Sequence, residues 1–182
     1  MKKQILLVFF IAFTSALSGQ KYFSKTGVIH FLSQAPLENI QATNTGSYVV
    51  MDAPSGQIEW SVLIKGFKFE KALQQTHFNE NYMESDKFPK AIFKGKMINV
   101  SAVNFTENGN YKVNVEGSMT IHGITKPLSA PALISVNNGK IKTSGSFNLK
   151  LADYGIKVPH VVKNNISDTV DVTVSAELQE LK

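Results

Sequence analysis

The segment from Lys140 to Leu151 reads Lys-Ile-Lys-Thr-Ser-Gly-Ser-Phe-Asn-Leu-Lys-Leu, and its side chains alternate between two kinds. One face of an extended chain would carry Ile141, Thr143, Phe147, Leu149 and Leu151, while the other would carry Lys140, Lys142, Ser144, Asn148 and Lys150. Because successive side chains of a β-strand point to opposite faces, this pattern predicts a strand with one dry face and one solvated face.

Similar period-two patterns occur along most of the chain after the N-terminus. Together they predict about eight strands, at residues 27–33, 47–51, 58–64, 91–100, 111–121, 127–136, 140–151 and 170–176. Turn-forming residues separate several of these runs, at Pro54-Ser55-Gly56, Asn108-Gly109 and Asn138-Gly139. Such residues tolerate positive φ and are typical of hairpins, so neighbouring strands are expected to be antiparallel.

Residues 69–84 are the one helical candidate, since they lack strict alternation and contain no glycine or proline. The remaining pattern describes an all-β protein. Its sheet could bury the apolar faces by closing into a barrel or by folding into a sandwich. Long strands joined by hairpins favour a barrel. A barrel of about eight strands is just wide enough to be filled by its own side chains or to hold a slender ligand.

The first nineteen residues have the layout of a cleavable secretory signal. Lys2 and Lys3 precede an apolar stretch at 5–13, and small residues follow at Ala16, Ser18 and Gly19. The stretch is shorter than the ~20 residues that cross a bilayer, so stable membrane insertion after cleavage is not expected. We therefore predict a signal peptide at 1–19, a single domain at 20–182 and a periplasmic or secreted location. The chain has no cysteine, which excludes a lipid-modified cysteine and disulfides.

The charged residues argue against nucleic-acid binding. Without Lys2 and Lys3, 17 of the 19 basic residues remain with all 14 acidic ones, a formal charge of only +3. Every basic residue is a lysine, so the bidentate contacts that arginine makes with phosphates and base edges are not available.

The four histidines do not form a recognisable catalytic pattern. His77-Phe78-Asn79-Glu80 begins like an H-x-x-E-H zinc signature, but residue 81 is asparagine, so the second imidazole is missing. His122 stands beside Gly123 at a predicted strand end, where we expect it to hydrogen-bond a turn. No G-x-S-x-G motif occurs. We therefore expect no catalytic residue, no metal and no cofactor, and predict that the protein is not an enzyme.

Three segments resemble the YceI-like domain family. They are residues 77–93, from His77 to Phe93; residues 117–127, Gly-Ser-Met-Thr-Ile-His-Gly-Ile-Thr-Lys-Pro; and residues 147–159, which include Asp153-Tyr154-Gly155-Ile156. The resemblance implies an exported, lipocalin-like antiparallel barrel that encloses a polyisoprenoid or related long-chain amphiphile. The first strand departs from the family, because Gly27-Val28-Ile29-His30-Phe31 stands where many members have an Asp-x-x-His-Ser pattern. Because of this departure, the resemblance does not predict which head group the ligand carries.

An apolar barrel interior could bind such a molecule through burial alone, since each methylene removed from water contributes ~0.8 kcal/mol. The inward faces of the predicted strands give the expected lining: Trp60, Val62, Ile64, Phe93, Val113, Val115, Met119, Ile121, Phe147, Leu149, Val172 and Val174. Two functions are compatible with these residues. One is a carrier of a polyisoprenoid, isoprenoid quinone precursor or fatty-acid derivative; the other is a protein-interaction module whose core is filled by its own side chains. Either could act as a monomer or a homodimer.

Overall fold

The computed structural model describes residues 20–181, so the predicted signal peptide at 1–19 lies outside the described residues. The strands are β1 (Lys21–Gln34), β2 (Asn39–Asp52), β3 (Gln57–Leu63), β4 (Lys68–Phe69), β5 (Lys90–Met97), β6 (Gly109–Ile121), β7 (Ile124–Asn137), β8 (Lys140–Lys150) and β9 (Thr169–Glu180). The helical elements are α1 (Ala72–His77), the π-helical turn η2 (Phe78–Tyr82) and the 3₁₀ turns η1 (Ile64–Gly66), η3 (Val100–Ala102), η4 (Leu151–Tyr154) and η5 (His160–Val162).

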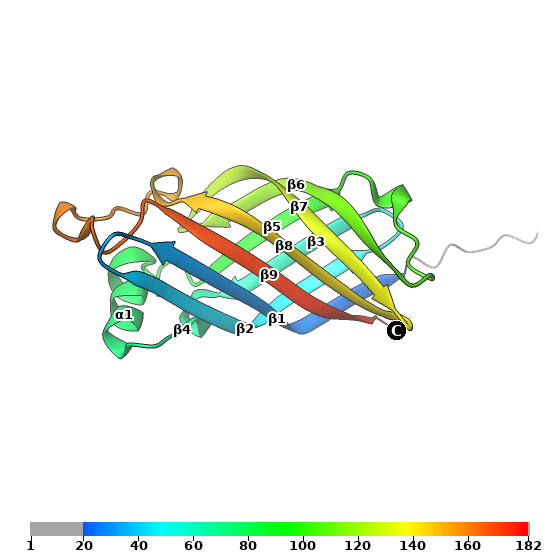
Figure 1. Ribbon diagram of the computed structural model, residues 1–182, viewed down its shortest axis with the longest axis horizontal. Helices are drawn as coiled ribbons and strands as arrows, with labels where there is room; N and C mark the ends of the chain where they lie inside the picture. Colours follow the sequence, from blue (N-terminus) through cyan, green and yellow to red (C-terminus); the bar gives the residue numbers. More distant parts are fainter. Residues whose placement is uncertain (1–19, 182) are drawn as a thin grey trace, which may run out of the picture.

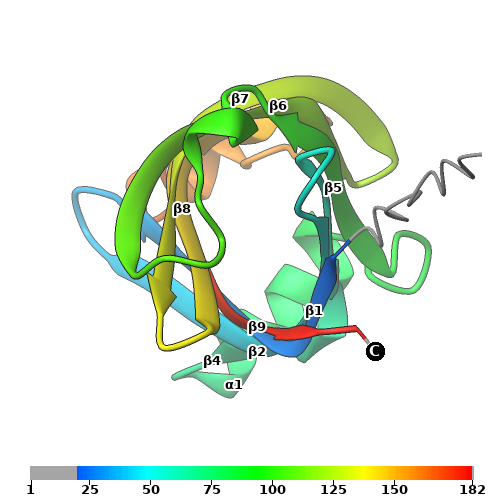
Figure 2. The same cartoon turned by 90° about the vertical axis from the view of Figure 1, so that its right-hand side faces the viewer.

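The eight long strands form a closed antiparallel barrel, and Figures 1 and 2 show its ring. Their order is β1-β9-β8-β7-β6-β5-β3-β2, and β2 pairs with β1 to close the ring. The short strand β4 pairs with the part of β2 nearest the β1–β2 loop. The prediction of an all-β protein with about eight strands is therefore confirmed, and of the two ways to bury the apolar faces the chain uses the barrel.

Two of the predicted turns form at tight strand connections, and one does not. Asn138 and Gly139 have φ values of 49° and 76° between β7 and β8, and Gly56 has a φ of 73° before β3. Asn108-Gly109 is different, because Gly109 already belongs to β6 and the β5–β6 connection is the longer loop 98–108. Positive φ values instead mark the turn at His122 and Gly123, which joins β6 to β7.

Strands β1 and β2 have 14 residues each, two to three times the length of the predicted runs, because each contains an irregularity that shifts its alternation. Before the irregularity the buried residues of β1 are Tyr22 and Ser24, and from the irregularity onward they are Gly27, Ile29 and Ser33. The pairing register of β1 with β2 shifts at the same place. β2 changes phase in the same way between residues 44 and 47. A β-bulge moves side chains to the other face, so the pattern could be recognised only in one half of each strand.

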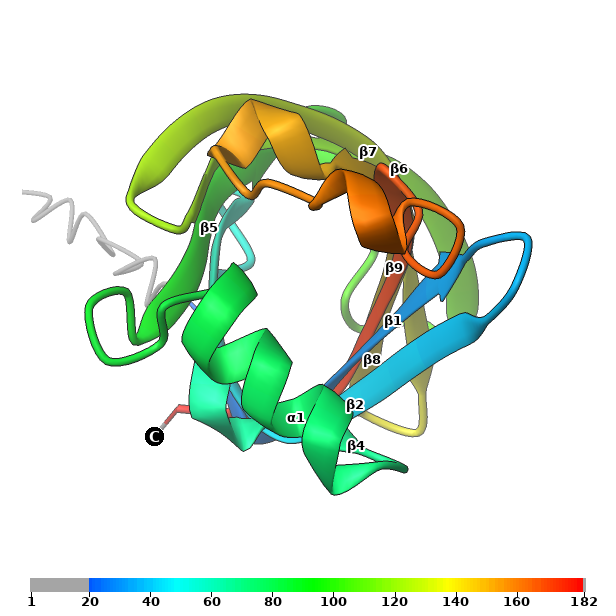
Figure 3. The same ribbon diagram turned by 90° about the vertical axis from the view of Figure 1, so that its left-hand side faces the viewer.

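The predicted helix is present but shorter than 69–84, since its helical turns cover only residues 72–82. Phe69 is not helical, because it pairs with Ala42 as part of β4. Figure 3 shows α1 and the loops around η4 and η5 at the same end of the barrel. Among the helices of residues 20–181, none has the length and apolar character needed to cross a membrane.

The C-terminus lies at the other end of the barrel (Figure 1), and buried side chains fill this end. Met51, Met97, Ile134 and Ile141 are at most 1% exposed there. The ring of Tyr22 stacks on Phe105 from the loop 98–108, at a centroid distance of 6.3 Å. Side chains of the protein itself therefore close this end.

Candidate functional site

The half of the barrel nearer α1 contains a cavity of about 600 Å³. This volume lies in the ~300–1,000 Å³ range of small-molecule sites. Its wall includes inward side chains from Ile58 on β3 to Ile64 at the start of η1, a distance of roughly 20 Å at about 3.3 Å per residue of extended chain. Exposed residues such as Leu73 also line it, so the cavity opens at the α1 end. It is an elongated, blind-ended pocket.

Ten of the twelve residues predicted to line the interior do line this cavity: Trp60, Val62, Ile64, Phe93, Val115, Met119, Ile121, Phe147, Val172 and Val174. Val113 does not; it is a buried core residue, 3% exposed, opposite Ala132 on β7. Leu149 does not either; it is half-buried and packs against the core. Alternation predicts the face on which a side chain lies but not its height along the barrel. Contact of these residues with a ligand stays a prediction.

Small side chains contribute to the free space. Ala91, Ala130, Ala132 and Gly145 all line the cavity, on β5, β7 and β8. A small residue on the inner face leaves room that a leucine or phenylalanine would fill. The alanines at 130 and 132 are two residues apart on one strand, a signal that the sequence offered and that the predicted lining omitted.

Four phenylalanines gather near the open end, where α1 and η2 meet the barrel. Phe78 is the centre of this aromatic cluster, with ring centroids 4.9 Å from Phe69, 5.6 Å from Phe31 and 5.7 Å from Phe67. All four line the cavity. The alternating pattern does not predict this cluster, because three of the four residues lie outside the alternating strands and their contacts depend on the docking of the helix.

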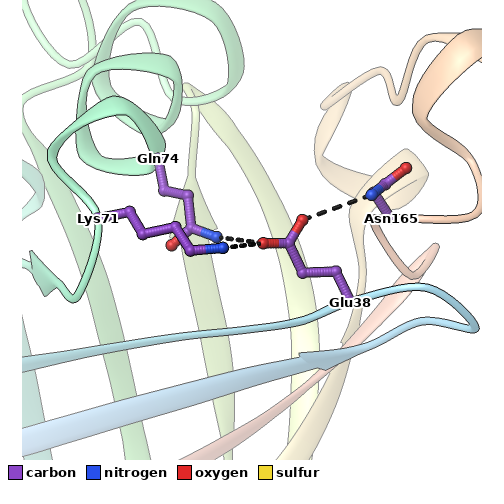
Figure 4. Close-up of polar contacts among 4 residues, drawn as sticks. All are labelled: Glu38, Lys71, Gln74 and Asn165. Atoms are coloured by element: carbon purple, nitrogen blue, oxygen red, sulfur yellow. Dashed lines mark hydrogen bonds and ion pairs between the residues drawn. The ribbon is translucent and has the colours of Figure 1, made fainter.

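Polar residues at the mouth form a second group, the Glu38 cluster, composed of Glu38, Lys71, Gln74 and Asn165 (Figure 4). One carboxylate oxygen of Glu38 accepts hydrogen bonds from Lys71 Nζ at 2.8 Å and from Gln74 Nε2 at 3.0 Å. The other accepts from Asn165 Nδ2 at 3.4 Å. The cluster joins the β1–β2 loop, the start of α1 and the segment before β9.

The hydrogen bond between Glu38 and Lys71 also favours the charged form of both groups. It is the main cause that lowers the pKa of Glu38 and the main cause that raises the pKa of Lys71. The hydrogen bond from Asn165 lowers the pKa of Glu38 further. Both groups are therefore ionised at neutral pH, and they form an ion pair at the rim of an apolar cavity.

The indole of Trp60 also lies in the cavity wall, and its polar atom is satisfied. Its Nε1 donates to Ser47 Oγ at 2.9 Å, and both residues are buried. The ring therefore presents carbon to the cavity, while its N–H group is paired.

His122 connects three segments at the open end, but it does not line the cavity. Its Nδ1 is 3.1 Å from the carbonyl oxygen of Tyr154 in η4, and its Nε2 is 2.8 Å from Glu84. Its ring also packs edge-on against Phe88. The prediction that His122 hydrogen-bonds a turn is confirmed, although the turn is η4 and not its own.

His77 does line the cavity mouth, and its Nδ1 lies 3.0 Å from Asn81 Nδ2, the residue that replaces the second zinc histidine. Within residues 20–181, no three histidine, aspartate or glutamate side chains come together in a way that could hold a metal ion.

A model of the YceI-like domain matches residues 20–178 of the sequence, nearly the whole part that folds into the barrel. The chain belongs to the YceI-like domain family. A UPF0312 protein of Vibrio parahaemolyticus is 29% identical over 84 residues, which is 43% of this chain. That match spans only 41% of the relative.

Solved structures show the same YceI-like barrel. A polyisoprenoid-binding domain from Saccharophagus degradans, implicated in plant cell wall breakdown, has a TM-score of 0.77 at 12% identity, over 88% of this chain and 98% of that one. BcnA of Burkholderia cenocepacia has a TM-score of 0.68 at 14% identity, over 84% and 96%. The YCEI protein of Campylobacter jejuni has a TM-score of 0.54 at 17% identity, over 100% and 99%. At these identities the likeness concerns the fold.

Proposed function

We propose that this protein is an exported carrier or buffer that holds one long-chain amphiphile in its barrel, such as a polyisoprenoid, an isoprenoid quinone precursor or a fatty-acid derivative. The observation that carries the proposal is the elongated apolar cavity of about 600 Å³, open at one end. The description of the Saccharophagus degradans neighbour as a polyisoprenoid-binding domain supports the same ligand class.

Burial of the ligand chain supplies the binding energy without catalysis. A dozen methylenes transferred from water could contribute on the order of 10 kcal/mol before the costs of ordering the ligand. The aliphatic and aromatic wall needs no reactive group to provide this, so the proposed function is binding.

A barrel filled by its own side chains would favour an interaction module instead. That description fits only the end that contains Met51, Met97 and Ile141, since the other half is hollow. The hollow half makes the carrier the better account.

A series of ligands with one head group and increasing tail length tests the proposal. Trp60 is the only tryptophan of the chain and lines the cavity, so its fluorescence emission reports on occupation of the cavity. For protein stripped of lipid, affinity should rise about fourfold per added methylene, the equivalent of ~0.8 kcal/mol, and level off when the cavity is full.

The variant Ala132→Phe provides the matched control. Ala132 lines the cavity, so a phenyl ring there should fill part of the cavity. The affinity should then level off at a shorter tail length than in the wild type. Ala152→Phe, at an exposed position in η4 that does not line the cavity, should leave the plateau unchanged. Affinity that does not depend on tail length, or that Ala132→Phe leaves unaltered, would overturn the carrier proposal.

Export is the second part of the proposal and rests on the signal-like residues 1–19. Cell fractionation should recover the protein outside the cytoplasm, with an N-terminus near Gln20. Recovery of the full-length chain in the cytoplasm would contradict it.

A further inference from the structure

We infer that the Glu38 cluster is the head-group site of the cavity, and that it selects amphiphiles with an uncharged, carbonyl-containing head over those with an ionic head. This inference rests on the proposed function, because it concerns the end of the same bound molecule.

The position of the cluster supports this role. All four residues line the cavity, and they do so at its mouth. Among the described residues that line it, Glu38 and Lys71 are the only aspartate, glutamate or lysine side chains. An amphiphile whose tail fills the apolar part therefore places its head beside this ion pair.

The charges of the cluster disfavour an anionic head. Lys71 Nζ is 2.8 Å from the Glu38 carboxylate, so the positive charge is already matched. A carboxylate or phosphate head must either lie beside Glu38, which repels it, or displace Glu38 from Lys71. His77, the other side chain at the mouth that can carry a positive charge, is exposed and contacts Asn81.

A cationic head is disfavoured because Lys71 already pairs with Glu38. The two oxygens of Glu38 already accept from Lys71, Gln74 and Asn165. An ammonium group that used the remaining acceptor site of the carboxylate would lie close to the Lys71 ammonium group, which repels it, and would share a single negative charge with Lys71.

An uncharged carbonyl group can accept hydrogen bonds from the N–H groups of the cluster that do not bond Glu38. An ammonium group has three N–H donors and a primary amide has two, and each donor group of the cluster uses one of them on Glu38. Lys71, Gln74 and Asn165 therefore retain N–H groups that a ligand carbonyl oxygen can accept from, while the ion pair stays intact.

Three probes with the same tail test the selection: dodecanamide, dodecanoate and dodecylamine, titrated into lipid-free protein with Trp60 emission as the readout. Because the ion pair lies at a solvated rim, the expected preference for the amide over either ion is about tenfold. In Glu38→Gln, the freed Lys71 should attract the carboxylate, and the preference for amide over dodecanoate should fall by about tenfold.

The matched control is Glu80→Gln, which removes an exposed carboxylate from η2 that does not line the cavity. It should retain the wild-type order of affinities. Equal affinities of wild type for the three probes, or the same change in Glu80→Gln as in Glu38→Gln, would overturn the head-group assignment. If affinity still depends on tail length in that case, the carrier proposal stands; if no probe binds, both fail.

Discussion

At the level of single residues, the hydrogen bond between Trp60 and Ser47 places a polar group inside an otherwise apolar wall. The bond depends on Gly27, since a Cβ atom at that position would lie 2.5 Å from Ser47 Oγ and 3.2 Å from a ring carbon of Trp60. Glycine at the β1 irregularity therefore leaves room for the pair. Gly27 thus has a structural role beside the cavity.

Replacing Ser47 by alanine should leave the buried indole N–H of Trp60 without a partner. The expected loss is about 1–3 kcal/mol in the free energy of unfolding, measured by urea denaturation. Ser118→Ala, at an exposed position on β6, should change stability by less than about 0.5 kcal/mol. Equal stability of the two variants would show that the Trp60 hydrogen bond contributes nothing.

Placing a lysine at Val115 tests the assignment of the inner face. Val115 lines the cavity, so an unpaired ammonium group there should abolish lipid retention, or folding itself, because burying it costs several kcal/mol. The neighbouring variant Glu116→Lys points outward and should fold and bind normally. Circular dichroism and lipid extraction measure the two properties. A Val115→Lys protein that folds and keeps its lipid would show that the face is wrongly assigned.

Acid should loosen the mouth of the cavity through Glu38. Its pKa is lowered in the folded protein, mainly by the hydrogen bond from Lys71, so its contribution is fully present above the unfolded value and is lost as the pH falls through the lower folded value. Ligand release should therefore be steady near neutral pH and accelerate below about pH 4. Stopped-flow measurement of Trp60 emission follows the release. An acid step of the same size in Glu38→Gln would assign the effect to another group.

Period-two alternation along the strands predicts some of the site residues but not the others. Phe93 and Phe147 lie on regular strands, and alternation alone placed them on the inner face. Glu38 and Asn165 are 127 positions apart, in two loops without any period, and they meet only because the barrel closes. Nothing in the local sequence of either residue indicates the other.

At the level of elements, the helical segment α1–η2 is attached to the barrel through the aromatic cluster around Phe78. The sequence predicts a helix here but not its attachment to the barrel. The segment lacks alternation, which excluded a strand, whereas the contacts of Phe78 come from β1, β4 and the residue between η1 and β4. Pairing of Phe69 with β2 decided where the helix begins, and such pairing depends on tertiary structure.

Truncating Phe78 to alanine should release the helix from the barrel. The side chain is half-buried, so we expect a loss of about 1–3 kcal/mol, below the 3–5 kcal/mol of a fully buried phenylalanine. Limited proteolysis should then cleave within residues 72–82, and lipid should exchange faster. Glu80→Ala, in the same helical turn but exposed, serves as the comparison. Unchanged protease resistance of Phe78→Ala would mean that other contacts hold the helix in place.

At the level of the whole molecule, one barrel combines a solid end and a hollow end. Bulky side chains such as Met51 and Ile141 fill the end near the C-terminus, while Ala130, Ala132 and Gly145 leave the other end open. The period-two pattern predicted the closed apolar interior but not its division into two halves. That division depends on the volumes of side chains at each height, which alternation does not record.

Native mass spectrometry of the protein purified from cells under non-denaturing conditions tests most directly whether the hollow half holds a single long-chain amphiphile. We predict one adduct of several hundred daltons per chain, lost after organic extraction and reduced in the cavity-filling variant Ala132→Phe. A mass equal to that of the bare polypeptide, from wild type and Ala132→Phe alike, would contradict this account of the barrel.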